Sequence, residues 1–121
     1  MLKEPLLKIQ SLTHIEGQID VELEIDQHSE ILAAHFPDQP IVPGACMLQI
    51  VKEILADSLK TDLRLLRADN IKFLSLVEPS TKTLQLKIDY KQADQEIRAT
   101  AILFNGDITY MKLQGVFGNN R

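Results

Sequence analysis

Hydrophobic and polar residues alternate along several stretches of the chain. In residues 18–26, QIDVELEID, an apolar side chain occupies every second position and an acid stands between each pair. This period of two predicts a half-buried strand with an acidic outer face. Residues 84–90, LQLKIDY, alternate in the same way, and residues 70–79 predict a strand that ends at Pro79. Residues 96–104 and 107–117 predict two more strands, because they flank Asn105-Gly106, a strong hairpin signal.

From Gly44 onward the period changes to that of a helix. The apolar positions at helical spacing are Met47, Leu48, Ile50, Val51, Ile54, Leu55 and Leu59. Gln49, Lys52 and Glu53 share another stripe. This helix is apolar over most of its circumference, so other elements must surround it. One such helix with several antiparallel strands indicates an α+β fold in which a curved sheet folds around the helix.

The segment before this helix is expected to be short and irregular. Residues 29–36, SEILAAHF, predict a helical turn with Ser29 as its N-cap. Three prolines at positions 37, 40 and 43 then exclude helix and favour an extended loop.

Length and composition narrow the class of protein. A chain of 121 residues, 45% hydrophobic and 25% charged, is expected to be one globular domain over 1–121. Cys46 is the only cysteine, which excludes an internal disulfide and favours a reducing compartment. No apolar run is long enough for a signal peptide or a membrane span, so we expect a cytoplasmic protein.

The distribution of charge argues against a nucleic-acid partner but allows an acidic one. A net charge of −4 argues against binding to nucleic acid. Residues 60–82 nevertheless carry five basic side chains against three acids, and this small basic surface could dock an acidic partner. Ordinary solvated charges would give the same pattern.

Two motifs resemble those of the hot-dog-fold 3-hydroxyacyl-acyl-carrier-protein dehydratases of bacterial fatty-acid synthesis. Residues 35–44, HFPDQPIVPG, followed by the helix, are similar to that family's H-F-P-x-x-P-x-x-P-G loop. Residues 70–88, NIKFLSLVEPSTKTLQLKI, resemble the family's strand with a basic-Phe pair, a Val-x-Pro and an alternating strand. The resemblance covers roughly residues 18–117. It implies a single hot-dog domain and a dimer whose sheets join edge to edge, with no metal and no dissociable cofactor.

The resemblance also implies roles for individual residues. His35 matches the family's catalytic base, and imidazole titrates near neutral pH. Gly44 matches the glycine whose N–H would hold the thioester carbonyl oxygen at the helix start. Pro43, Ala45 and Phe36 are expected beside it in the substrate-binding site. The Lys72-Phe73 pair is expected to be structural, although it could contact a phosphate-bearing arm. Cys46 is expected to be a small buried apolar residue.

Gln49 departs from the family pattern, which places Glu or Asp fourteen residues after the histidine. An amide can orient a hydroxyl or a water molecule but cannot release a proton near neutral pH. General-acid catalysis contributes roughly 10²–10⁴-fold, or about 3–5 kcal/mol of barrier. Glu53 follows one turn later, roughly 6 Å along the axis, which is too far to replace the acid unless the substrate is shifted. Gln49 could also be an ordinary solvated residue.

Three functional hypotheses follow. The first is a dehydratase-like enzyme acting on 3-hydroxyacyl thioesters of acyl-carrier protein, with His35 as base and Gln49 orienting the hydroxyl; isomerisation of an enoyl thioester belongs with it. The second is a non-catalytic acyl-carrier-protein binder, or the inert half of a heterodimer with an acid-bearing paralogue. The third is an acyl thioesterase, which we rank last because no acid on the helix is placed to activate water.

Overall fold

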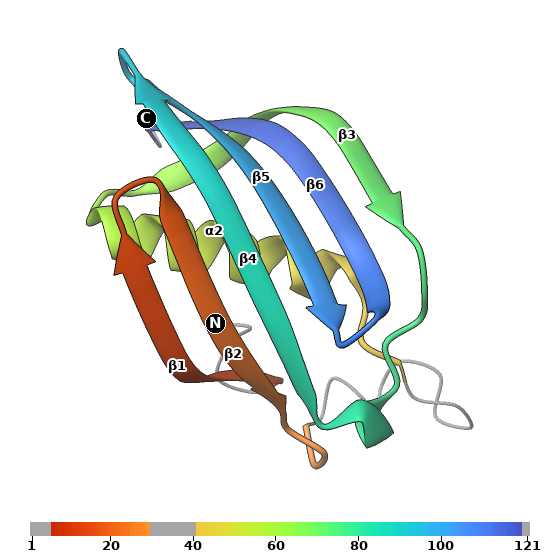
Figure 1. Cartoon of the computed structure of the whole chain (residues 1–121). Coiled ribbons are helices and arrows are strands. Elements are labelled where there is room, and N and C mark those ends of the chain that lie inside the picture. The colour runs from red at the N-terminus through yellow and green to blue at the C-terminus, as the bar shows by residue number, and fades with distance from the viewer. Residues whose placement is uncertain (1–5, 30–40, 120–121) are drawn as a thin grey trace.

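A six-stranded sheet curves around one long helix in the part of the chain that the computed structural model describes, residues 6–29 and 41–119 (Figure 1). The strands are β1 (Leu7–Ile15), β2 (Gln18–Ile25), β3 (Leu63–Phe73), β4 (Thr83–Ala93), β5 (Glu96–Asn105) and β6 (Ile108–Asn119). The helix is α2 (Gly44–Leu59), and a short 3-10 turn, η1 (Pro79–Thr81), precedes β4. The strand order is β1-β2-β4-β5-β6-β3, with all neighbours antiparallel.

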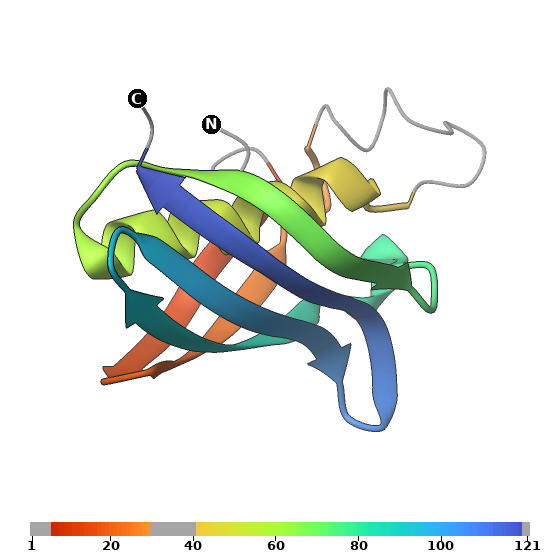
Figure 2. The same cartoon turned by 90° about the horizontal axis from the view of Figure 1, so that it is seen from above.

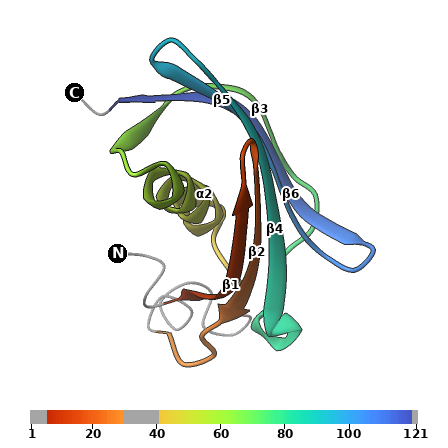
Figure 3. The same cartoon turned by 60° about the vertical axis from the view of Figure 1, so that its left-hand side comes forward.

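The helix lies against the concave face of the sheet, as Figures 2 and 3 show. Because side chains alternate between the two faces of a strand, every second residue points toward the helix. On β2 and β4 the apolar side chains at every second position are buried, while most of the polar ones between them are exposed. The helix buries Cys46, Met47, Ile50, Val51, Ile54 and Leu55 against this face. Each large apolar side chain that is fully buried stabilises the fold by about 1.5–3 kcal/mol. The predicted α+β architecture is therefore confirmed.

Three details differ from the sequence-based expectations. The strand predicted for residues 70–79 begins earlier, at Leu63, and ends at Phe73. Strand β1 was not anticipated at all. In the β5–β6 hairpin Asn105 pairs with Ile108, so the turn consists of Gly106 and Asp107, and Gly106 takes the positive φ of 57°. Apart from Ser29, the helical turn predicted for residues 29–36 lies outside the described residues.

Strands β1 and β3 form the two edges of the sheet. The β3 side exposes several large apolar side chains on the strand and on the segment that follows it, namely Leu65, Leu66, Phe73, Leu74 and Leu76. None of the helices in the described part of the chain has the length and apolar character needed to cross a membrane.

Candidate active site at the start of helix α2

Helix α2 begins without a side-chain cap. Pro43 is the N-cap residue, with an extended backbone at φ −65° and ψ 146°. Its carbonyl accepts hydrogen bonds from the N–H groups of Cys46, at 3.1 Å, and Met47, at 3.4 Å. The first turn holds no acidic residue, and within the described chain no hydrogen-bond acceptor meets the N–H of Gly44 or Ala45. These two donors stand at the positive end of the helix dipole, where an oxygen gaining negative charge is stabilised.

The segment after β3 encloses this helix start. The Val42 N–H donates to the Val77 carbonyl at 2.9 Å. The Phe73 ring lies directly against Gly44, because a β-carbon added at Gly44 would come within 2.9 Å of ring atoms Cε1 and Cζ. Phe73 is still 52% exposed, so one part of the ring covers the glycine and another part faces outward. Phe73 therefore belongs to the candidate site, although a structural role was the first expectation for it.

Gln49 is half-buried beside a small apolar cavity and is not an ordinary solvated residue. The cavity has a volume of about 190 Å³ and lies between α2 and strands β3 and β6; its lining is Ala45, Leu48, Gln49, Lys52, Leu65, Leu113 and Phe117. The Gln49 amide nitrogen Nε2 donates a hydrogen bond to Oε2 of Glu53 at 2.9 Å. The amide therefore has a fixed partner one turn along the helix.

The structure brings together Pro43, Gly44, Ala45 and Gln49 on the first turns of one helix. Gln49 is five positions after Gly44, or about 7.5 Å along the helix axis. His35 and Phe36, the other two predicted site residues, lie outside the described residues. Between Ala45 and Met47 the side chain of Cys46 points into the core, and burial raises the pKa of its thiol. A protonated, buried thiol is a poor nucleophile, in keeping with a packing role.

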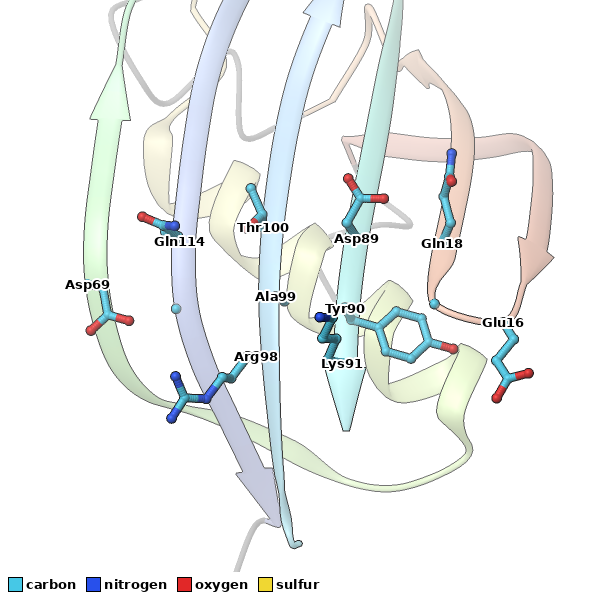
Figure 4. Close-up of a pocket in the computed structure, with 12 residues that line it drawn as sticks. Glu16, Gln18, Asp69, Asp89, Tyr90, Lys91, Arg98, Ala99, Thr100 and Gln114 are labelled. Carbon is cyan, nitrogen blue, oxygen red and sulfur yellow. The ribbon is translucent and has the colours of Figure 1, made fainter. Parts of the chain in front are cut away.

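A larger hollow of about 610 Å³ lies on the face of the sheet opposite the helix (Figure 4). A polar row of side chains from four adjacent strands crosses it, namely Gln18, Asp89, Thr100 and Gln114, each the direct partner of the next. Charges of both signs surround this row, and none of the predicted site residues is there. No group of three or more His, Cys, Asp or Glu suited to a metal ion occurs among residues 6–29 and 41–119. The predicted site residues that the structure describes are instead at the start of α2.

Solved structures of other proteins have a similar fold. A solved structure of the dehydratase heterocomplex ApeI:P from Xenorhabdus doucetiae contains a similar chain, with a TM-score of 0.76 and 19% identity over 93% of this chain and 97% of that chain. An uncharacterised protein from Erwinia carotovora subsp. atroseptica gives a TM-score of 0.71 and 21% identity, covering 93% of both chains. A hypothetical thioesterase with coenzyme A from Streptococcus pneumoniae TIGR4 gives 0.65 and 14%, over 95% of this chain and 91% of that chain.

The sequence itself matches a family directly. Residues 11–107 match the ApeI-like family, described as ApeI dehydratase. This match includes strand β2, helix α2 and strands β3, β4 and β5. The chain therefore belongs to the ApeI-like dehydratase family and has the hot-dog fold.

Proposed function

We propose that this chain removes water from 3-hydroxyacyl thioesters, or adds water to the corresponding 2-enoyl thioesters, with His35 as the base. The observation that carries the proposal is the uncapped start of α2, where the N–H groups of Gly44 and Ala45 have no acceptor among the described residues. A thioester carbonyl needs such donors when its α-proton is removed, because negative charge then develops on the carbonyl oxygen. Membership of a dehydratase family supports this use of the helix start.

The chemistry can be divided among the named residues. Dehydration breaks the C2–H and C3–O bonds and forms the C2=C3 double bond. His35 takes the C2 proton, and the Gly44 N–H stabilises the enolate-like oxygen. Pro43, Ala45 and Phe36 are the proposed neighbours of the acyl group, and Gln49 orients the departing hydroxyl or a water molecule. Isomerisation of an enoyl thioester would use the same base. The proposal calls for no cofactor.

An acyl-carrier protein is the proposed form in which the substrate arrives. Lys72 of β3 and Lys112 of β6 are direct cross-strand partners, and both are exposed. Like charges placed opposite each other destabilise a strand pair, and an acidic partner would relieve that repulsion. Lys72 directly precedes Phe73, which covers the helix start. Successive side chains of a strand point to opposite faces, so these lysines lie on the face away from Phe73, and the thioester arm of a carrier docked there would reach Gly44 around the β3 edge.

A second subunit is the proposed partner at the β3 edge. This edge has no neighbouring strand within the described chain and exposes apolar side chains. An unpaired, apolar edge is a template for pairing with another chain. A homodimer would satisfy it, and so would a heterodimer with an acid-bearing paralogue. The ApeI:P structure from Xenorhabdus doucetiae is a dehydratase heterocomplex, which favours testing both assemblies.

The decisive experiment is turnover of short and medium 3-hydroxyacyl thioesters, carried on acyl-carrier protein or coenzyme A and followed by mass spectrometry. Wild type is compared with His35→Ala and Gln49→Glu. Enoyl product from wild type that disappears in His35→Ala supports the enzyme. Turnover by Gln49→Glu alone would contradict it and support the second candidate, a non-catalytic binder or heterodimer half that has lost its acid. Release of free thiol would instead indicate a thioesterase.

A further inference from the structure

We propose that Glu53 supplies the acid of this site and that Gln49 is the positioning residue that holds it. This inference rests on the proposed dehydratase function and names the proton donor that position 49 lacks. Two observations carry it: the hydrogen bond between the two side chains, and an oxygen of Glu53 that is buried without a partner in the described chain.

The first observation changes the distance argument made from the sequence. The backbone positions of residues 49 and 53 are separated by about 6 Å along the helix axis. Side chains on a helix lean toward its N-terminus, so the carboxylate of residue 53 reaches back over the preceding turn. In the structure Oε2 of Glu53 lies 2.9 Å from Nε2 of Gln49. The carboxylate is therefore within hydrogen-bond reach of the group that replaces the expected acid.

The second observation distinguishes the two oxygens of Glu53. Oε2 accepts the amide N–H, whereas Oε1 is buried and has no hydrogen-bond partner within residues 6–29 and 41–119. A buried carboxylate oxygen without a donor is costly, and a hydrogen-bond donor on a ligand would remove that cost. In the proposed role of Glu53 as the acid, its carbonyl oxygen would be Oε2, which accepts from the amide, and its hydroxyl would be Oε1. Gln49 thus selects the oxygen that carries the proton.

With Glu53 as the acid and His35 as the base, every proton transferred in the elimination has a donor and an acceptor. The C2 proton moves to the imidazole of His35 as the C2–H bond breaks, and its electron pair forms the C2=C3 bond. The C3–O bond breaks, and the proton on Glu53 moves to the departing oxygen, which leaves as water. Glu53 ends as a carboxylate and His35 as an imidazolium, so one proton transferred from imidazolium to carboxylate, directly or through solvent, restores the starting state. Hydration runs through the same steps in reverse.

The test compares four variants with wild type in the thioester assay, with the partner subunit present if turnover requires it. The variants are Glu53→Gln, Gln49→Ala, the swapped Gln49→Glu/Glu53→Gln, and the control Asp57→Asn, which alters an exposed carboxylate one turn further along. Thermal unfolding of each variant checks that the fold is retained. We expect Glu53→Gln to lower kcat by roughly 10²–10⁴-fold with little change in KM. The swapped variant should recover most of that loss, and Asp57→Asn should match wild type.

Gln49→Ala tests positioning separately. It should lower kcat when Glu53 is present, and in a fifth variant, Gln49→Ala/Glu53→Gln, it should add little to the effect of Glu53→Gln, because the two side chains act as one unit. A wild type that turns over while Glu53→Gln keeps its kcat overturns the assignment of Glu53 and leaves the proposed function standing. No turnover by wild type with any partner overturns both. Turnover by the swapped variant while wild type is inactive likewise overturns both, and it shows that the site works only with an acid at position 49.

Discussion

At the residue scale, Gly44 lies where a backbone donor and an aromatic ring meet. Its N–H is one of the uncapped donors of α2, and its α-carbon lies under the ring of Phe73. A side chain here would compete with both the ring and any ligand for the same space. Glycine is therefore required by close approach and not by an unusual φ angle, since Gly44 is not among the residues with positive φ.

Replacing Gly44 with Ala should harm activity more than stability. The new methyl group would lie 2.9 Å from two ring carbons of Phe73, but the half-exposed ring can rotate away. We expect the free energy of unfolding to fall by about 1 kcal/mol, measured in urea. The methyl group would stand in front of the donor, so kcat/KM should fall at least about tenfold, or about 1.4 kcal/mol of transition-state stabilisation.

Phe73→Ala, alone and combined with Gly44→Ala, provides the control. Removing the ring should abolish the stability cost of the added methyl group, because no clash remains. It should not restore kcat/KM if the methyl group itself blocks the donor. An unchanged kcat/KM in Gly44→Ala would contradict a role for this N–H in holding the carbonyl.

Some of the candidate site was visible in the sequence and some was not. Gly44 follows Pro43 at the change of period, so the helix start could be predicted from the residues alone. The spacing of Gln49 and Glu53 is i and i+4, which already allows their side chains to meet. Spacing could not show that Glu53 has a buried oxygen or that Phe73 folds back onto Gly44. The Phe73 contact joins residues 29 positions apart in the chain, and both features depend on tertiary packing.

At the element scale, the strand that was not predicted, β1, and the strand predicted with the wrong bounds, β3, both pair irregularly with a neighbour. The register of β1 with β2 shifts between Ile9 and Ser11. The alternation of apolar and polar positions therefore holds on each side of this bulge but is interrupted at it. Strand β3 has two such shifts, between Leu65 and Arg67 and between Ala68 and Asn70. A bulge inserts one residue and breaks the period of two. Strands β2 and β4 pair with each other without a register shift. Their alternation of apolar and polar residues could therefore be recognised in the sequence.

Strand β1 is fastened to the sheet by a side-chain contact as well as by its backbone ladder. His14 Nε2 and the Tyr90 hydroxyl are 2.6 Å apart, and this hydrogen bond joins β1 to β4 across the end of β2. Replacing Tyr90 with Phe removes the hydroxyl and keeps the ring, so we expect a loss of about 1 kcal/mol in the free energy of unfolding. Urea unfolding followed by circular dichroism measures the change.

Tyr110→Phe is the matched control, because Tyr110 is also buried and its hydroxyl makes no hydrogen bond to another described residue. It should unfold close to the wild-type midpoint. Equal losses from both substitutions would mean that removing a hydroxyl matters by itself and that the His14 contact adds nothing. Amide exchange should also show β1 opening more readily in Tyr90→Phe, as expected for a less well held edge strand.

At the scale of the whole molecule, the two sheet edges are unlike. Strand β1 exposes Ile9, Leu12 and Ile15, the last of them beside the β1–β2 turn. On the other edge, the exposed apolar side chains follow β3 and continue into the segment that leads to Val77. That segment also covers the start of α2 through Phe73 and Val77. A subunit docked on the β3 edge would therefore bury apolar surface and approach the candidate site at the same time.

Charge placed on the β3 side should disrupt assembly, whereas charge on the β1 edge should not. Leu74 and Leu76 are 50% and 65% exposed, so Leu74→Asp/Leu76→Asp should leave the fold intact and weaken self-association at least about tenfold. Ile15→Asp, at a residue 70% exposed, is the matched control on the opposite edge. Sedimentation velocity over a concentration series measures both, with circular dichroism to confirm folding. If Ile15→Asp dissociates the assembly and the leucine variant does not, the β1 edge is the interface and the second subunit lies on the far side of the sheet from Phe73.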